Sequence, residues 1–173
     1  MENKKWGTRL PWIIGGVVVI LVIAIVLLCI FSGKGYEEVV GKYIEYSFEG
    51  KTEQIFDLMP EEVVEAAAKE GGMTVSQMKS YFKKMGESTM TSLNDAMGAG
   101  WTYSYEITGS EKVTGSELDA IKDEFQEVDL KVSRAVEVEV EVTLTGSKQT
   151  QSEEINVTVV KIGNKWYLAS MDN

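Results

Sequence analysis

The side chains of this chain that could perform acid–base chemistry are one aspartate and three tyrosines. Asp57 could act as a general base inside an apolar cavity, because burial raises the pKa of a carboxylate. Tyr43, Tyr103 and Tyr105 could supply a phenolic acid beside it. The alternative is that Asp57 lies on the exposed side of its helix while the tyrosines belong to a core, and we favour this alternative.

Other common catalytic groups are missing from the sequence. It contains no histidine, which removes the usual general base and the usual metal ligand. Its one cysteine, Cys29, lies inside a long apolar run, so no thiol nucleophile is expected elsewhere. There is no glycine-rich phosphate loop after a strand and no serine elbow. The sequence therefore predicts a chain that is not an enzyme and that needs no cofactor or metal.

Three glutamates, Glu137, Glu139 and Glu141, alternate with valines and should share one face of a strand. Same-face neighbours on a strand lie about 6.5–7 Å apart, which is too far for all three to bind one calcium ion at about 2.3–2.6 Å. We therefore expect a solvated acidic face, with Lys161 as a cross-strand partner that eases the repulsion. A weak patch for divalent ions or cationic partners is the alternative.

A 22-residue run without any charge extends from Leu10 to Phe31. As a helix it would be about 33 Å long, which is enough to cross a hydrocarbon core of about 30 Å. A cleaved signal peptide usually has a shorter apolar region that ends in small residues. A lipid-modified Cys29 is also disfavoured, because Leu28 precedes it and the run continues beyond it. We therefore expect contact with the lipid bilayer through Leu10 to Phe31.

The orientation of this segment follows from its flanking cations. Lys4, Lys5 and Arg9 precede the run, and cytoplasmic flanks carry the excess of positive charge. The predicted organisation is a cytoplasmic tail (1–9), a transmembrane helix (10–32) and an extracytoplasmic domain (33–173). The expected location is the cell membrane, with a single pass and the carboxyl-terminal domain outside.

The predicted outer domain is strongly acidic. The whole chain has a formal charge of -10, and residues 1–34 hold four cations against Glu2, so the remainder carries -13. Such a domain is repelled by nucleic acid and by anionic lipid headgroups. No nucleic-acid partner is expected, and the sequence predicts no oligomeric state.

Helical periodicity dominates the first half of this domain. Helices are expected over residues 37–48, 52–59, 60–71 and 74–97, and the last should start at a capping box formed by Thr74 and Gln77. We expect the apolar side of that helix to pack on a sheet, and Gly86 to mark a close approach or a kink. A flexible binding groove lined by its methionines is the alternative. That side comprises Val75, Met78, Phe82, Met85, Leu93 and Ala96.

The second half changes to the two-residue period of strands. Strands are expected over residues 101–107, 135–145, 155–159 and 166–168, with turns at Gly146-Ser147-Lys148 and Gly163-Asn164. A short helix through Phe125 should start at a capping box over residues 116–119. The predicted fold class is α+β, with helices packed on a curved antiparallel sheet of about four strands.

This element order resembles the nuclear-transport-factor-2-like (NTF2-like, cystatin-like) superfamily over Tyr36 to Asn173. The resemblance rests on Tyr43, on the opening Phe56-Asp57-Leu58-Met59, and on the closing Gly163-Asn164-Lys165-Trp166-Tyr167-Leu168, which is similar to the terminal pattern of many small bacterial surface proteins. It implies a cone-shaped sheet with helices in its hollow. The candidate residues for a ligand pocket there are Tyr43, Phe82, Trp101, Tyr103 and Tyr105.

Three functions are compatible with these features. The first is a membrane-anchored, non-catalytic extracytoplasmic domain that binds a protein partner or small ligand. The second is a structural assembly subunit, because the layout of the chain resembles assembly proteins of type IV secretion systems. The third is an isomerase or dehydratase that uses an acid–base pair inside the cone. We favour the first.

Overall fold

The computed structural model describes residues 35–172. The expectations for the tail, for Cys29 and for the anchor from Leu10 to Phe31 therefore fall outside the described residues. Within residues 35–172, no helix has the length and apolar character needed to span a bilayer.

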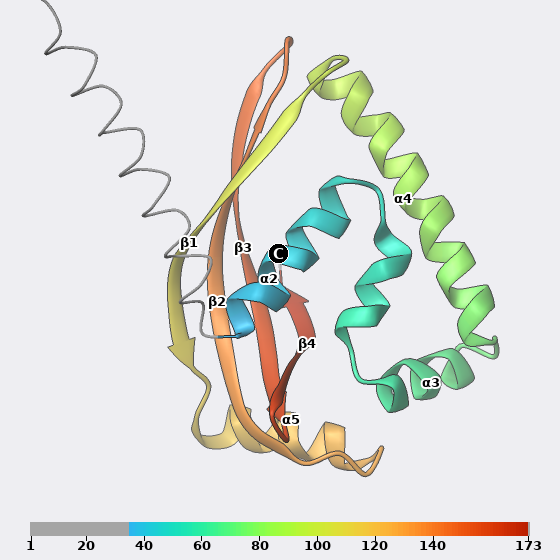
Figure 1. Ribbon diagram of the computed structural model, residues 1–173, viewed down its shortest axis with the longest axis vertical. Helices are drawn as coiled ribbons and strands as arrows, with labels where there is room; N and C mark the ends of the chain where they lie inside the picture. Colours follow the sequence, from blue (N-terminus) through green and yellow to red (C-terminus); the bar gives the residue numbers. More distant parts are fainter. Residues whose placement is uncertain (1–34, 173) are drawn as a thin grey trace, which may run out of the picture. The chain divides into compact units, whose positions relative to one another are not determined.

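The elements, in chain order (Figure 1), are α2 (Tyr36–Phe48), the 3-10 helix η1 (Thr52–Leu58), α3 (Glu61–Glu70), α4 (Val75–Met97), β1 (Thr102–Lys112), α5 (Gly115–Gln126), β2 (Val132–Thr145), β3 (Thr150–Ile162) and β4 (Lys165–Asp172).

The four strands form one antiparallel sheet in the order β1-β2-β3-β4, so each strand pairs with the next strand of the chain. The hairpin at Gly146 places Thr145 opposite Thr150, and this pairing sets the register of β2 against β3. The predicted α+β class, with helices packed on a four-stranded antiparallel sheet, is confirmed.

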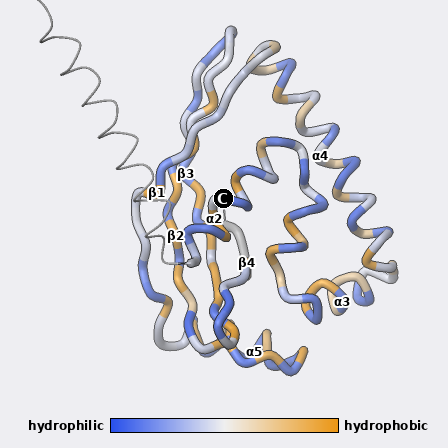
Figure 2. Tube along the Cα trace, viewed as in Figure 1, coloured by the Kyte–Doolittle hydropathy of each residue, from blue (hydrophilic) through white to orange (hydrophobic). Residues whose placement is uncertain are grey.

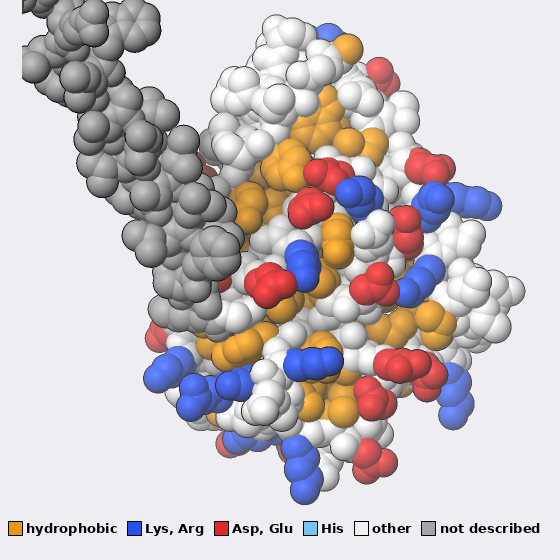
Figure 3. Space-filling view, viewed as in Figure 1, with side chains coloured by type: hydrophobic (Ala, Val, Ile, Leu, Met, Phe, Trp, Pro, Cys, Tyr) orange, Lys and Arg blue, Asp and Glu red, His pale blue; other side chains and the backbone are white. Residues whose placement is uncertain are grey.

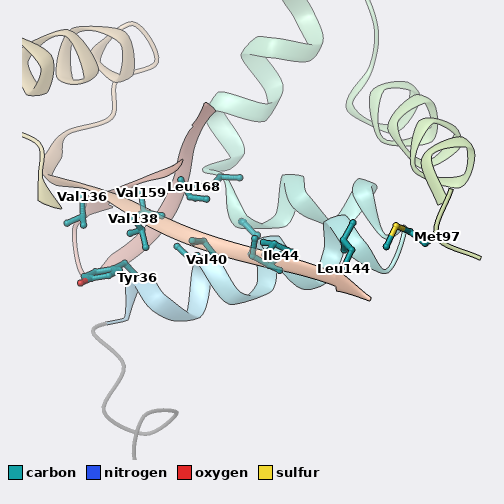
Figure 4. Packing of buried hydrophobic residues seen from close by; sticks show 13 residues of the cluster. Tyr36, Val40, Ile44, Met97, Val136, Val138, Leu144, Val159 and Leu168 are labelled. Atoms are coloured by element: carbon teal, nitrogen blue, oxygen red, sulfur yellow. The ribbon is translucent and has the colours of Figure 1, made fainter. Parts of the chain in front are cut away.

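Helix α2 covers one face of the sheet. Its Val40 and Ile44 are both 0 % exposed and pack in one cluster with valines of β2 and β3 and with Leu168 of β4. Figure 4 shows these side chains between α2 and the sheet, with Tyr36 at one end of the cluster and Met97 at the other. The alternation of valine and glutamate along β2 explains the arrangement, because successive strand residues point to opposite faces. We call α2 and the four strands the sheet core.

Helix α5 packs on the opposite face from α2. Phe125 clusters with Ala135 and Val160, whereas Val136, the next residue along β2, belongs to the α2 cluster. The sheet is thus covered on both faces at this end, which sequence periodicity alone did not predict. The predicted capping box over residues 116–119 is wrong: α5 begins at Gly115 after Thr114, and no side chain caps it.

Helix α4 starts as predicted but packs differently. The Thr74 hydroxyl accepts a hydrogen bond from the Gln77 amide (3.2 Å), and the Gln77 side chain accepts one from the Thr74 amide (2.8 Å). However, α4 packs against η1 and α3, and only its carboxyl-terminal end reaches the sheet core. The expectation that this side of α4 faces the sheet is wrong for Phe82, Met85 and Ala96, because all three are exposed. It is also wrong for Val75 and Met78, which pack with Val64 and Ala68 of α3.

The middle and the carboxyl-terminal end of α4 are held by different parts of the chain. Gly86, at the middle, packs on the start of η1, where an added Cβ would lie 2.5 Å from the Thr52 hydroxyl, which confirms the predicted close approach. At the far end, the Lys148 amide of the β2–β3 hairpin donates to the Met97 carbonyl (3.0 Å), and the Lys148 ammonium donates to the Asp95 carbonyl (2.5 Å). These bonds satisfy carbonyls that a helix end leaves without partners.

Residues 52–86, which comprise η1, α3 and the first half of α4, form what we call the helical module. Its own cluster contains three buried side chains, Val64, Ala68 and Met78. Figure 2 shows hydrophobic residues along β2 and β3 and also on α3, whereas α4 alternates between hydrophobic and hydrophilic residues along its length.

Candidate functional site

The aromatic residues of β1 pack over α2. Tyr103 and Tyr105 stand opposite Leu144 and Val142 of β2, on the face that α2 covers. The Tyr103 ring stacks on Phe48 of α2 at 5.4 Å between centroids. The Tyr105 hydroxyl lies against the backbone of α2 at Gly41, where an added Cβ would be 2.7 Å from it. These contacts show that the two rings cover α2.

Trp101 and Tyr43 border the same cluster. The Trp101 indole donates a hydrogen bond to the Asn94 side chain of α4 (2.9 Å), and both aromatic residues are partly buried against the sheet core. Burial raises the pKa of the Tyr43 phenol, and a hydrogen bond with Ser47 partly opposes this effect. Burial also raises the pKa of Tyr103, with nearby Glu49 and Glu45 adding to the shift. Both phenols are therefore held in the neutral form.

Phe82, the fifth predicted pocket residue, packs elsewhere. Its ring meets Phe56 of η1 edge-on at 4.9 Å and Tyr81 at 5.8 Å. The structure thus gathers Tyr43, Trp101, Tyr103 and Tyr105 around α2 and the start of β1, and places Phe82 in the helical module.

Asp57 does not lie beside a tyrosine hydroxyl. Its side chain is 59 % exposed, and one carboxylate oxygen pairs with the Lys79 ammonium at 2.6 Å. The acid–base pair considered from the sequence is therefore not formed between these residues. Lys79 is on α4, so the ion pair joins η1 to α4 at the surface.

The predicted acidic face is larger than the three glutamates of β2. Glu106 of β1, Glu141 of β2 and Glu154 of β3 stand directly opposite one another, and Glu111 stands opposite Glu137. Directly opposed side chains lie about 4.5–5.5 Å apart at Cβ, and like charges there destabilise the sheet. Among residues 35–172, no group of acidic side chains has a geometry that could hold a metal ion.

Lys161 does not relieve this repulsion, contrary to the expectation from the sequence. In the register of β2 and β3 it stands opposite Arg134, and it faces the α2 side of the sheet. There its ammonium lies 5.8 Å from the centroid of the Trp166 ring. The prediction omitted Glu106, Glu111 and Glu154. Glu154 could have been predicted from the turn at Gly146. The hairpin register that this turn sets places Glu154 opposite Glu141.

A second surface feature, of which only Phe82 was among the predicted site residues, lies at the start of α4. Of the five large apolar side chains that remain exposed among the described residues, four lie here and the fifth is Tyr105 of β1 (44 %). The four are Met73 (38 %), Tyr81 (59 %), Phe82 (37 %) and Met85 (46 %). We call these four residues the α4 patch. Between Val75 and Gly86 the helix carries Lys79, Lys83 and Lys84 and no acidic residue. On the face seen in Figure 3, hydrophobic side chains likewise reach the surface among lysines and carboxylates.

Comparison with known proteins assigns no relative to this chain. No protein-family model, curated protein or solved structure matches it. The resemblance to the NTF2-like superfamily stays a prediction, which these comparisons do not test.

Proposed function

We propose that this protein is a membrane-anchored binding module, and that its outer domain docks a protein partner on the α4 patch. The observation that carries the proposal is the exposure of four large apolar side chains within thirteen residues, Met73 to Met85. Soluble surfaces rarely leave such residues together, and exposed apolar patches rimmed by polar residues mark contact sites.

The chemistry of the partner follows from the charges around the patch. Lys83 and Lys84 are exposed beside Tyr81 and Met85, whereas the domain as a whole carries -13. This part of α4 is therefore a local cationic surface on an acidic protein. It fits a protein segment that combines apolar side chains with carboxylates, because opposite charges steer association and fix its register.

The anchor is the apolar run from Leu10 to Phe31, which is long enough to cross a bilayer. The cations before it favour an inside amino terminus and an outer domain. The NTF2-like assignment belongs to the same proposal, and the order of helices followed by an antiparallel meander supports it.

A surface contact is favoured over a small ligand held between α2 and the sheet. Val40 and Ile44 are packed against the strand valines, and the ring of Tyr103 stacks on Phe48. Tyr103 thus packs on α2, and Tyr105 contacts α2 although it stays 44 % exposed. Tyr81 is more exposed, at 59 %, and Met85 is 46 % exposed.

The test is site-specific photocrosslinking of the full chain in its membrane. A benzophenone side chain at Tyr81 should give one discrete adduct with a protein partner, and the variant Lys83→Glu/Lys84→Glu should reduce its yield about tenfold through lost charge complementarity. The same probe at Glu65, an exposed position on α3, is the matched control and should give no such adduct.

Three results would contradict the proposal: no adduct at Tyr81, equal adducts at both positions, or an adduct that is insensitive to charge reversal. Adducts with lipid alone at Tyr81 would assign the patch to the bilayer. Release of the full chain from membranes by alkaline carbonate would overturn the anchor.

A further inference from the structure

We infer that the end of the sheet beside Gly35 lies against anionic phospholipid headgroups and so orients the outer domain. The inference rests on the proposed membrane anchor and adds a second surface to it. Its basis is the place where the chain enters the domain, together with the charges that the sheet register collects there.

The connection between the apolar run and the domain is short. Only Ser32 to Gly35 separate Phe31 from Tyr36, the first residue of α2. Even fully extended, this connection spans at most about 18 Å, at roughly 3.6 Å per residue. The headgroup layer extends about 5–7 Å beyond the hydrocarbon on each side. The surface around Gly35 is therefore held within reach of the headgroups.

Trp166 forms the surface next to Gly35. An added Cβ at Gly35 would lie 3.0 Å from the indole, and the Tyr36 ring meets the indole edge-on at 5.3 Å. Figure 4 shows Tyr36 at the same end of the core as Val136 and at the opposite end from Met97. The chain thus enters at one defined end of the sheet.

The sheet register places three cations at this end, on the face that carries Trp166. Lys161 is directly opposite Trp166, Arg134 is directly opposite Lys161, and Lys112 is opposite Val136. We call Lys112, Arg134, Lys161 and Trp166 the basic end. The nearest acidic side chains along β1 and β2, Glu111 and Glu137, are paired with each other on the other face of the sheet, where α5 also packs. On the α2 side, Glu37 and Glu38 open the helix, and Glu38 is paired with Lys42 at 2.7 Å.

The chemistry of the basic end matches a phospholipid surface. Lysine and arginine near an anionic bilayer are attracted to it, and tryptophan prefers the headgroup level. The opposed glutamates of β1, β2 and β3 point to the other face of the sheet. A domain of net -13 is repelled by the same surface, so attraction at one end combined with repulsion elsewhere selects one orientation.

The experiment uses the full chain in vesicles of phosphatidylcholine, with and without phosphatidylglycerol. In a Cys29→Ser background, an environment-sensitive dye is attached through Asn164→Cys in the β3–β4 turn beside Trp166, or through Ser147→Cys in the β2–β3 hairpin. Headgroup-nitroxide lipids should quench the dye at 164 about twofold more with phosphatidylglycerol than without. The dye at 147 should show no such difference, and added salt should remove the difference at 164.

Arg134→Gln/Lys161→Gln should abolish the effect of phosphatidylglycerol at 164. Lys83→Gln/Lys84→Gln makes the same charge change on α4 and should leave the effect intact. Equal quenching at 164 in both lipids, or loss of the effect in the α4 variant, overturns the inference while the anchor stands. A chain that does not stay in the vesicles after carbonate treatment overturns both the anchor and the inference.

Discussion

The sheet core and the helical module are built from similar apolar residues but bury them to different degrees. The largest fully buried side chains among the described residues come from α2, the strands and the end of α4, and they include Val40, Ile44 and Leu168. The helical module buries three side chains in its own cluster and leaves Tyr81 and Met85 about half exposed. The sheet core therefore supplies most of the stability, and the module offers a surface.

The largest expected effect comes from a cavity in the sheet core. Ile44→Ala should lower the free energy of unfolding by about 2–5 kcal/mol, because Ile44 is fully buried between α2 and the strands. Chemical denaturation of the full chain in detergent measures it. Met78→Ala in the module should cost about 2 kcal/mol, at the low end of this range, since a small cluster collapses around the loss. Equal costs would contradict the comparison.

A smaller effect is expected at the contact between α4 and the turn before η1. Gly86→Ala should destabilise the protein by about 1–3 kcal/mol, because its Cβ would meet the Thr52 hydroxyl and the Gly50 carbonyl. Adding Thr52→Ala should recover part of this loss in a double-mutant cycle. Ser80→Ala, at an exposed α4 position, is the control and should change little. A stabilising Gly86→Ala would show that the turn yields easily.

Removing the amino-terminal cap of α4 should destabilise the helical module more than the sheet core. Thr74→Ala loses the hydrogen bond to the Gln77 amide and should cost about 1 kcal/mol. Hydrogen exchange should become faster in α3 and the first half of α4, while the amides of β2 and β3 keep their rates. Uniform acceleration in all of these elements would show that the module does not open separately.

The smallest effect is a pH dependence in the sheet core. The pKa of Tyr43 is raised above its usual 10.0 by burial, so the folded protein holds the proton at a pH where the unfolded chain has begun to lose it. The contribution of Tyr43 to stability is complete below pH 10 and declines as the pH rises through the raised pKa. Tyr43→Phe should lose less stability than the wild type above pH 10 in denaturation curves. If the stability of Tyr43→Phe and of the wild type changed with pH in parallel, the raised pKa of Tyr43 would be contradicted.

The sequence predicted the sheet core better than the helical module. The alternation of valine with glutamate over 136–144 identifies both the strand and its buried face, because a period of two allows only one assignment. The helical period over 75–97 also identifies a helix and its capping box. It does not say how much of the apolar side a neighbour covers, and so Phe82 and Met85 were wrongly placed against the sheet.

The acidic face of the sheet was predicted less completely, because the residues that form it come together only through the pairing of strands. Lys161 was assigned to the acidic face. It follows Val157 and Val159 at a spacing of two residues, however, and therefore points to the α2 side of the sheet as they do. Glu106 and Glu154 were missed for the same reason, since they join Glu141 only through the registers of two hairpins. Tyr43, Trp101 and Tyr103 border the core, as aromatic residues at strand and helix spacing often do, and their role in a ligand pocket stays a prediction.

The order of elements along the chain has a consequence for how the protein is made. Helix α2 is the first described element, and it packs on Leu168 in β4, more than a hundred residues later. At a synthesis rate of about 5–20 residues per second, the apolar side of α2 waits for its partners for several seconds or longer. Val40 and Ile44 therefore stay uncovered until the strands of the sheet have left the ribosome. During that interval α2 presents an apolar side that can aggregate, so its shielding favours correct folding of this domain.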